Sequence, residues 1–566
     1  MSHPVISEFD IIFAGGGTTA CVVAGRLAAW DPSLSILILK GGQHTLNQAV
    51  HVQPYRFTSH HVPTSTTMTF NVGNPSPRLN GRAPIVSCAH CIGGGSSVNT
   101  MVYTRAPASD FDDWGADGWE SKNLIPLMKK LETYEVQPDR PTHGYGGPIK
   151  VSYGGCKLRA SEEFHPCWHD IRRYIDGTTG RRSDAAHHYV YNQAHNANLQ
   201  IWVGKRGAVI FRDKRAVGVE FTSDPVSCPD AGQSSSIVRA SKLVVVTAGA
   251  FGSPAILERS GIGAEAILKR CDIQQLVDLP GVGENYCGLR DHNIVSVPYF
   301  SADGAVTMDS LWRGKECCPG PFNRQGNIIE HLAQWKINGK SLIAQNGTDA
   351  KIKWRPDDDE LKAMGSSLST TMEGLYPASA GSIHIKWDEN GQEGIDFNTG
   401  YLMIHPILYL LTLDTKRCAK FFDGMPSYRG EVPAGHPCFP EGSAAVCRET
   451  TGPVDLNAPD LIYTAEDDEA IDRYNRDCGM SHPYHYQTTW HSLGTCAMKP
   501  RADQGVVDAR LNVYGVTNLK VADMSIAPKN VGTNTYSTAL LIGEKAAMII
   551  ADELGIECRP YKRVSK

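Results

Sequence analysis

The stretch that decides the fold is Phe9-Asp10-Ile11-Ile12-Phe13-Ala14-Gly15-Gly16-Gly17, near the start of this 566-residue chain. A short apolar run leads directly into three glycines, and a helix-forming segment at residues 21–30 follows them. Asp31-Pro32 ends that segment, and residues 35–39 form a second short apolar run. Continuous apolar runs of this length are typical of parallel strands that are buried on both faces. The order therefore predicts a strand–helix–strand unit of the kind that binds dinucleotides.

The glycine spacing Gly15-x-Gly17-x-x-Ala20 supports the same prediction. The first glycine permits a tight turn, the second lets the backbone approach a pyrophosphate, and a small third residue lets the helix pack on the strand. The N–H groups at the start of the helix would then point at the phosphates. We therefore expect Gly15, Gly17 and Thr18 to contact a nucleotide cofactor; a turn that serves packing alone is the alternative.

The end of the second strand carries Lys40-Gly41-Gly42, where such a unit ordinarily has Asp or Glu to hold ribose hydroxyls. An ammonium group donates hydrogen bonds and cannot accept them. Losing a charge-assisted hydrogen bond costs roughly 1.5–3 kcal/mol, so Lys40 should weaken cofactor binding without abolishing it. The alternative is that Lys40 binds a 2′-phosphate, which would favour NADP.

A second informative stretch lies near the other end of the chain. Trp490-His491-Ser492-Leu493-Gly494-Thr495 is followed by Asn530-Val531-Gly532-Thr533-Asn534-Thr535 and then by a helix-forming run at residues 538–554. The imidazole of His491 can accept a proton near pH 7, and the amide of Asn534 stands just before a helix. A nucleotide site at one terminus and this polar couple at the other predict an enzyme whose two ends fold together.

Further elements can be placed between the two ends. Residues 243–249 and 519–523 are candidate buried strands, and residues 381–386 alternate like a strand. A helix is expected over residues 253–259, with Pro254 in its first turn, where proline is tolerated. Residues from about 150 to 200 and from 300 to 480 are rich in His, Pro, Gly and aromatic residues and lack clean periodicity. They predict a second domain inserted into the first.

The composition excludes several classes of partner and of location. Net charge is −5 and no basic block occurs, so nucleic acid and anionic membranes are not expected partners. The longest apolar stretch, residues 401–413, is too short to span a bilayer. The 16 cysteines are scattered, and Cys88-Ala-His-Cys91 has no second CxxC partner, so we expect buried thiols and no metal site. No signal peptide is visible, and Val564-Ser565-Lys566 stops one residue short of a peroxisomal signal, so the expected location is intracellular, peroxisomal or cytoplasmic.

At this point the chain resembles the glucose–methanol–choline (GMC) family of FAD-dependent oxidoreductases, and within it the fungal methanol-type alcohol oxidases. The resemblance covers nearly the whole chain. The shared pieces occur in the family's order: Gly15–Gly17, Ala24–Leu27, Asn74–Pro77, Gly81-Arg82, Gly93–Asn99, Tyr103–Arg105, Ser109-Asp110, Gly180–Asp184, Ser253-Pro254, Ser260–Gly263, Leu279–Gly283, Thr489–Thr495, Asn512–Gly515, Val521–Asp523, Asn534-Thr535 and Gly543–Lys545. The resemblance favours FAD over NADP despite Lys40.

The resemblance implies a fold and a domain division. The fold class is α/β, with a discontinuous FAD-binding Rossmann-like domain and an inserted α+β substrate-binding domain. The FAD-binding domain would take residues 1–150, 200–300 and 480–566. The substrate-binding domain would take residues 151–199 and 301–479.

The resemblance also assigns roles to single residues. His491 and Asn534 match the family's catalytic pair, with His491 as the base and Asn534 as a donor to the developing alkoxide. The N-terminus of the last helix should lie near the flavin pyrimidine. Residues that match cofactor contacts are Gly15, Gly17, Thr18, Lys40, Gly94, Ser97, Asn99, Asp523 and Thr535. Residues expected in the substrate pocket are Thr100, Val102 and Trp490.

Four departures from the family pattern bear on activity. Asn285 is followed by an apparent insertion of three residues before Asp291-His292, and the second domain looks shorter than in the methanol-type enzymes. Thr100 and Val102 stand where that subgroup has bulky residues. Lys40 is the fourth departure. Together these departures leave an alternative interpretation, in which the protein is a paralogue that has lost its activity.

The expected reaction is oxidation of a primary alcohol by O₂ to an aldehyde and hydrogen peroxide, through bound FAD. The expected partners are thus a small alcohol and O₂, and a homo-oligomer stays open. One alternative is a dehydrogenase of the same family that uses a quinone acceptor. The other, in a different class, is a non-enzymatic homologue that folds without turning over.

Overall fold

The computed structural model describes residues 7–156, 172–232, 234–287, 299–301, 324–346, 380–389, 391–401, 412, 416, 426, 428–433, 436–455, 459–477 and 490–558. Most of the apolar stretch at residues 401–413, the pair Asp291-His292 and the last eight residues lie outside this part. The helices are α1 (Thr18–Trp30), α2 (Ala49–Val52), α3 (Ala108–Asp112), α4 (Ser121–Leu131), α6 (Gly249–Arg259), α7 (Glu265–Arg270), α9 (Arg324–Asn338), α13 (Ala465–Asp477) and α14 (Tyr536–Leu554).

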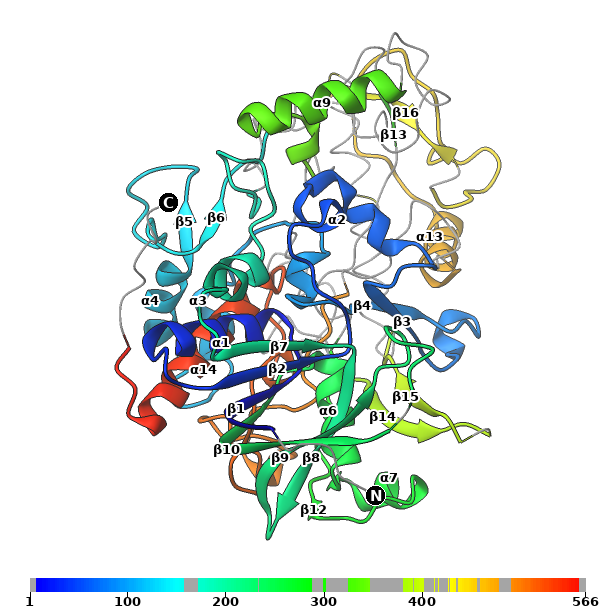
Figure 1. The fold of residues 1–566 in the computed structure, drawn as a ribbon. Coiled ribbons are helices and arrows are strands. Elements are labelled where there is room, and N and C mark those ends of the chain that lie inside the picture. Colours follow the sequence, from blue (N-terminus) through cyan, green and yellow to red (C-terminus); the bar gives the residue numbers. More distant parts are fainter. Residues whose placement is uncertain are drawn as a thin grey trace.

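The predicted strand–helix–strand unit forms the centre of a seven-stranded sheet (Figure 1). Its strands are β1 (Ser7–Ala14), β2 (Ile36–Lys40), β7 (Leu199–Val203), β8 (Lys205–Arg212), β9 (Arg215–Ser223), β10 (Ser236–Val246) and β17 (Leu519–Val521). The order is β7-β2-β1-β10-β9-β8, and β17 also pairs with β10. β1 is parallel to β2 and β10, and Ile11, Ile12 and Phe13 are fully buried. The α/β fold class and all four predicted strands of this sheet are confirmed.

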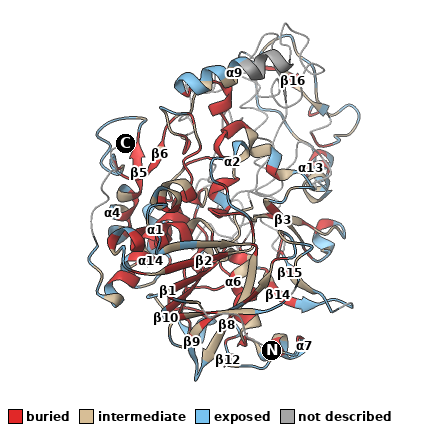
Figure 2. Cartoon of the chain, viewed as in Figure 1, coloured by how far each residue is buried: buried red, intermediate tan, exposed pale blue. Residues whose placement is uncertain are grey.

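The two ends of the chain pack together, as the sequence predicts. The blue α1 and the red α14 lie side by side in Figure 1. They approach closely because Gly543 has no side chain: a Cβ there would lie 2.6 Å from Cβ of Val22. Arg26 of α1 and Glu544 of α14 form an ion pair whose side chains are almost fully buried. The sheet and these two helices form the buried core (red in Figure 2).

The helix after β10 corrects one expectation. α6 begins at Gly249, four residues before the predicted start, so Pro254 lies inside the helix and not in its first turn. Proline has no N–H to donate to the carbonyl four residues earlier, which here belongs to Ala250. The hydroxyl of Thr495 donates to that carbonyl at 2.7 Å, and Thr495 is fully buried. A residue distant in sequence thus supplies the hydrogen bond that Pro254 removes.

Smaller sheets and short helical turns surround this core. The two-stranded sheets are β3–β4 (Met68–Val72, Ile85–Ala89), β5–β6 (Glu132–Tyr134, Ile149–Val151), β11–β12 (Ile262–Gly263, Val277–Asp278), β13–β16 (Tyr299–Ser301, Tyr428–Glu431) and β14–β15 (Ser382–Trp387, Glu393–Asn398). The short turns are η1 (Pro54–His61), η2 (Pro77–Leu79), η3 (Gly94–Ser97), η4 (Ala186–Val190), η5 (Tyr191–Gln193), η7 (Leu342–Ala344), η9 (Arg501–Asp503) and η10 (Met524–Ile526). The predicted strand at residues 381–386 is confirmed as β14. The domain boundaries stay a prediction.

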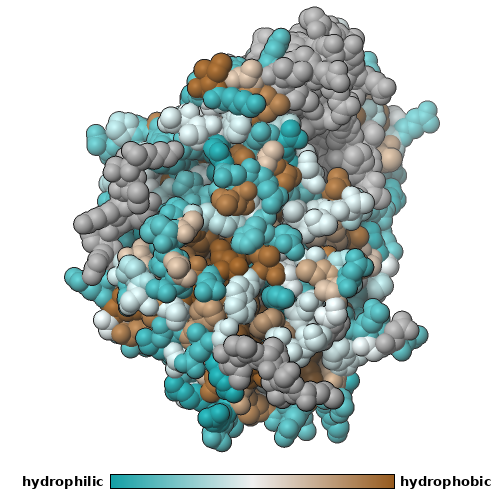
Figure 3. Space-filling view, in the orientation of Figure 1, coloured by the Kyte–Doolittle hydropathy of each residue, from teal (hydrophilic) through white to brown (hydrophobic). Residues whose placement is uncertain are grey.

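The surface mixes hydrophilic and apolar residues, with apolar atoms gathered near the middle of the face shown in Figure 3. In the part of the chain that the structure describes, no helix has the length and apolar character needed to cross a membrane.

Candidate active site

The glycine turn after β1 has the geometry that a bound pyrophosphate requires. Gly15 has φ +123°, and a Cβ there would lie 2.4 Å from the backbone carbon of Thr247. Gly17 is the N-cap of α1, and no side chain caps this helix within the described residues. A helix start without a protein acceptor leaves N–H groups for an anion. This part of the chain therefore fits the diphosphate of a dinucleotide.

A second glycine-rich segment, η3, lies against this turn. A Cβ on Gly94 would lie 2.9 Å from Cα of Gly17, and the Thr18 hydroxyl donates to the carbonyl of Gly93 at 2.9 Å. The structure thus brings Gly17, Thr18 and Gly94 together. Ser97 of η3 is fully buried, and its hydroxyl has no hydrogen-bond partner in the described part of the chain. An orphaned hydroxyl beside the turn fits a polar atom of a bound cofactor.

Asn99 is held by a buried arginine. Its Oδ1 accepts from Nη1 of Arg182 at 3.1 Å, from the N–H of Met101 at 3.0 Å and from the hydroxyl of Tyr174. Arg182 is 2% exposed and also donates to the Asn99 carbonyl at 2.8 Å. The amide oxygen of Asn99 is thus committed to the protein, and only its Nδ2 remains for a cofactor contact.

Asp523 has a structural task that the sequence did not predict. Its Oδ2 accepts from the N–H of Gly249 at 2.8 Å and from the hydroxyl of Ser253 at 2.5 Å. Its Oδ1 accepts from the N–H of Ser525 at 2.8 Å. The carboxylate therefore caps the start of α6, where negative charge is favourable. Any contact of Asp523 with a cofactor adds to this role.

The segment that carries His491 is fixed from two sides. Leu493 exchanges two backbone hydrogen bonds with Cys287, at 3.0 and 3.3 Å. The Thr495 carbonyl accepts from the N–H of Gly283 at 2.9 Å. Trp490 has φ +54°, a left-handed conformation that is uncommon for a bulky residue and clusters at functional sites. His491 itself is partly exposed, whereas residues 493–498 are buried.

The Asn534 loop is clamped by a residue that the sequence reasoning did not single out. Thr104 donates its hydroxyl to Oδ1 of Asn534 at 3.3 Å and accepts from the Asn534 N–H at 3.1 Å. The Thr104 carbonyl accepts from the hydroxyl of Ser537 at 2.6 Å, and Asp110 accepts from the N–H of Gly532 at 2.7 Å. Thr104 and Asp110 stood within the quoted motifs Tyr103–Arg105 and Ser109-Asp110, which was the available signal.

The helix after this loop begins two residues before the predicted start at residue 538. α14 starts at Tyr536, with Thr535 as its N-cap and without a side-chain cap within the described residues. Thr535 and Asn534 are both partly exposed. The start of α14 therefore has the free N–H groups that a developing negative charge would favour.

The expected pocket residues pack against a polar network. Asn346 donates to the carbonyl of Thr100 at 2.6 Å and accepts from Nε of Arg173 at 2.7 Å. Val102 forms a β-bridge with Arg173 and is 6% exposed. Neighbours thus lie close to both small residues, so the extra room predicted there stays a prediction.

A second imidazole lies beside the His491 segment. The ring of His61 lies 5.0 Å from the ring of Trp490, and its Nδ1 is buried without a hydrogen-bond partner in the described part. Burial, with the charge of Arg182, lowers the pKa of His61 to about 4, so this imidazole is neutral at pH 7. The sequence offered only the pair His60-His61 as a signal.

Cys91 is buried, as expected, whereas Cys88 is only partly buried. Burial raises the pKa of each to about 12, although the charge of Lys40 acts in the opposite direction. A buried, protonated thiol is a poor metal ligand and a poor nucleophile.

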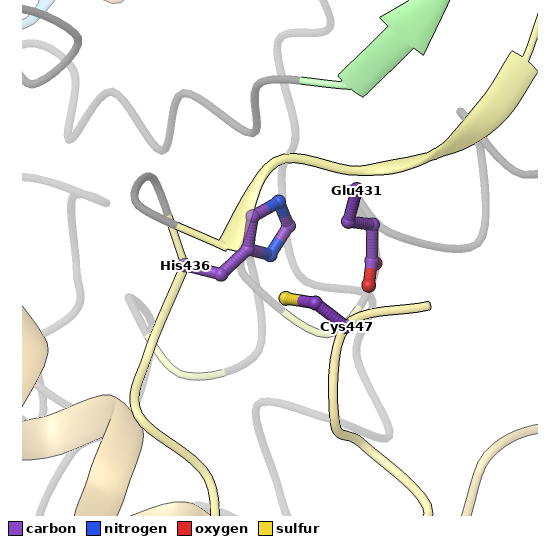
Figure 4. Close-up of side chains that lie close together, drawn as sticks. All are labelled: Glu431, His436 and Cys447. Carbon is purple, nitrogen blue, oxygen red and sulfur yellow. The ribbon is translucent and has the colours of Figure 1, made fainter. Parts of the chain in front are cut away.

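A cluster far along the chain combines three metal-ligating residue types, Glu431, His436 and Cys447 (Figure 4). One atom of each lies within 4.8 Å of the others. Burial and the neighbouring Glu431 carboxylate raise the pKa of the Cys447 thiol to about 12. The thiol is therefore protonated at neutral pH and can donate to Glu431. The sequence reasoning did not single out this cluster.

Comparisons with known proteins agree with this architecture. Residues 9–293 match the N-terminal part, and residues 426–543 the C-terminal part, of the GMC oxidoreductase family. The chain is 36% identical to an alcohol oxidase of Pichia angusta, over 97% of this chain and 95% of that one. A FAD-dependent oxidoreductase from Chaetomium thermophilum has the same fold, with TM-score 0.76 and 22% identity over 97% of this chain and 100% of its own. A fungal aryl-alcohol oxidase gives TM-score 0.72 and 20% identity over 97% and 100%. The chain therefore belongs to the GMC oxidoreductase family of FAD-dependent enzymes.

Proposed function

We propose that the protein oxidises a primary alcohol to an aldehyde and returns the electrons to O₂, giving hydrogen peroxide. The observation that carries the proposal is the similarity to an alcohol oxidase at 36% identity over 97% of this chain. The family matches at residues 9–293 and 426–543 include the glycine turn, His491 and Asn534, which supports a cofactor region and a catalytic pair in one chain.

The roles proposed for His491 and Asn534 follow from their chemistry. His491 takes the hydroxyl proton of the alcohol, because a neutral imidazole is an effective base near pH 7. Asn534 donates its amide N–H to the developing alkoxide. The hydrogen bond from Thr104 to Oδ1 of Asn534 orients the amide so that its nitrogen is the end presented as a donor. Bound FAD would accept the hydride from the alcohol carbon.

The residues that would hold FAD are those of the glycine turn and of η3. Gly15 and Gly17 leave room for the diphosphate, and the uncapped start of α1 supplies N–H groups. The orphaned hydroxyl of Ser97 and the Nδ2 of Asn99 would face the flavin half. The start of α14 would stabilise negative charge on the flavin pyrimidine.

The experiment has three readouts on the purified protein. Flavin absorbance bands test the cofactor, anaerobic stopped-flow reduction by a panel of alcohols tests the first half-reaction, and peroxide formation tests the acceptor. Flavin that is reduced by alcohol but not reoxidised by O₂ would favour the dehydrogenase that uses a quinone. Bound flavin that no alcohol reduces would favour the catalytically impaired homologue.

His491→Ala separates the base from the binding site. We expect the variant to retain FAD and to slow flavin reduction by about 10²–10⁴-fold, the usual effect of losing a general base. Asn534→Ala should also slow reduction, and the double variant should be less than additive if both residues act on one alkoxide. An unchanged reduction rate in His491→Ala would remove it from the role of base.

A further inference from the structure

The strand β2 ends in Lys40, which cannot accept the hydrogen bonds of ribose hydroxyls. Burial lowers the pKa of Lys40, and the nearby carboxylate of Asp224 acts in the opposite direction and favours the charged form. The remaining question is whether another part of the chain brings an acceptor to the same place.

Asp224 reaches this edge of the sheet from a different strand. It follows β9 directly, and its N–H donates to the carbonyl of Gly204 at 2.9 Å. Gly204 follows β7, whose last residue, Val203, pairs with Lys40 of β2. The carboxyl ends of parallel strands lie at one edge of a sheet, which is where ligands of such sheets bind. Asp224 is therefore held beside the end of β2 although it lies 184 positions further along the sequence.

The two carboxylate oxygens of Asp224 differ in their hydrogen bonds. Oδ1 accepts from Nε2 of His90 at 3.1 Å and from the N–H groups of Val226 and Ser227 at 3.1 and 2.9 Å. Oδ2 makes no hydrogen bond within the described residues, although the side chain is only 7% exposed. Burial opposes ionisation, but the hydrogen bonds from His90 and Ser227 outweigh it and hold the pKa of Asp224 below its usual value. Oδ2 is therefore the carboxylate oxygen that remains able to accept a hydrogen bond from a ligand.

Gly41 makes room for this oxygen. A Cβ at position 41 would lie 2.7 Å from Oδ2 of Asp224, so any larger residue would displace the carboxylate. Lys40, which cannot accept hydrogen bonds, is thus followed directly by Gly41, which leaves the space that the Asp224 carboxylate fills.

We propose that Oδ2 of Asp224 accepts hydrogen bonds from the ribose hydroxyls in the adenosine half of FAD, in place of an acidic residue at the end of β2. This inference rests on the proposed use of FAD and adds a residue that recognises it. The same carboxylate would repel a 2′-phosphate, which argues against NADP at this site.

The test compares the dissociation constants of FAD and of FAD analogues that lack the 2′- or the 3′-hydroxyl of the adenosine ribose, measured by flavin fluorescence on apoprotein. We expect wild type to prefer FAD by about 10- to 100-fold, the range for a charge-assisted hydrogen bond. In Asp224→Ala this preference should fall to near one. A general disturbance of the loop would weaken the binding of FAD and of both analogues by the same factor and would leave the ratios of their dissociation constants unchanged. Asp213→Asn, an exposed carboxylate in the β8–β9 turn, is the control and should keep the wild-type ratios.

Two further variants test the same contact from its surroundings. Gly41→Ala should displace Oδ2 and reduce the preference for FAD without removing any charge. Asp224→Asn should give a preference for FAD between those of wild type and Asp224→Ala. The single amide oxygen of Asn must accept from the N–H groups of Val226 and Ser227, so its Nδ2 would face the ribose. Wild-type ratios in Asp224→Ala, or no preference in wild type, would overturn the inference. Failure of wild type to bind FAD at all would overturn the proposed function instead.

Discussion

The hydrogen bond from Thr495 to the carbonyl of Ala250 should make a measurable contribution to the free energy of unfolding. Pro254 removes the N–H that a helix would direct at this carbonyl, and the hydroxyl of Thr495 replaces it at 2.7 Å. Thr495→Val keeps the shape of the side chain and removes the donor. A buried carbonyl left without a donor costs about 1–3 kcal/mol, so we expect the free energy of unfolding to fall by that amount.

The control is the same Thr495→Val substitution made in a Pro254→Ala background. In Pro254→Ala the N–H of residue 254 can reach Ala250, so Thr495→Val should then cost about 0.5 kcal/mol or less. The coupling energy of the double-mutant cycle should therefore be about 1–2 kcal/mol. Urea denaturation of the four proteins with saturating FAD measures it, provided the dependence on urea is the same in all four. Thr495→Ser keeps the hydroxyl and should remain within about 1 kcal/mol of wild type.

Thr495 also anchors the segment that carries His491. Loss of the hydrogen bond should loosen that segment, and misplacement of a base by about 1 Å can cost on the order of 10²-fold in rate. We expect Thr495→Val to slow anaerobic flavin reduction and to leave FAD affinity unchanged. Equal destabilisation by Thr495→Val in both backgrounds would refute the reasoning, because Pro254 would then have nothing to do with the role of Thr495.

Three other outcomes are expected. Glu544→Leu should lower the free energy of unfolding by about 3–5 kcal/mol in urea denaturation, because it removes the carboxylate that pairs with the buried charge of Arg26. Loss of Lys130, the more exposed partner of Glu544, should matter far less. Burial lowers the pKa of His384, but hydrogen bonds to Glu258 and Glu284 outweigh it and raise this pKa to about 9. The stability that His384 contributes should therefore be complete below about pH 6.5 and be lost as the pH rises through 9, and thermal unfolding of His384→Gln should lack that part of the pH dependence. Because Thr100 and Val102 are small, kcat/KM should rise from methanol along a series of longer alcohols by about 0.8 kcal/mol per buried methylene, and Thr100→Phe should shift the preference back toward short chains; methanol as the best substrate of wild type would contradict the pocket argument.

Local sequence was sufficient for the elements whose stability is local. The runs that form β1 and β2 are short and apolar, and each is followed by glycines, which is typical of buried parallel strands. The last helix was placed within two residues because its apolar run is long and Gly555 ends it in a left-handed conformation. In the site, the same local patterns gave the glycine turn and the start of α14.

Contacts between distant residues account for what the sequence did not show. Proline preference placed the start of α6 at Ser253, because a lone sequence cannot show that the hydroxyl of Thr495 relieves a proline inside a helix. The Asn534 loop depends on Thr104, which lies 430 residues earlier. Asp523 matched a cofactor contact, and its capping of α6 became visible only with the strands in place.

Pro254 and Lys40 belong to one pattern. Each breaks a local rule, and in each case a buried polar side chain from a distant segment stands where the missing group would act. The presence of Asp224 reverses the expected effect of Lys40→Glu on FAD binding. Considered by itself, Lys40→Glu restores a lost acceptor and should tighten FAD binding. With Asp224 in place it instead sets two carboxylates side by side, which is unfavourable. We therefore expect Lys40→Glu to tighten FAD binding in the Asp224→Ala background and not in wild type. Equal tightening in both backgrounds would show that Asp224 does not occupy this role.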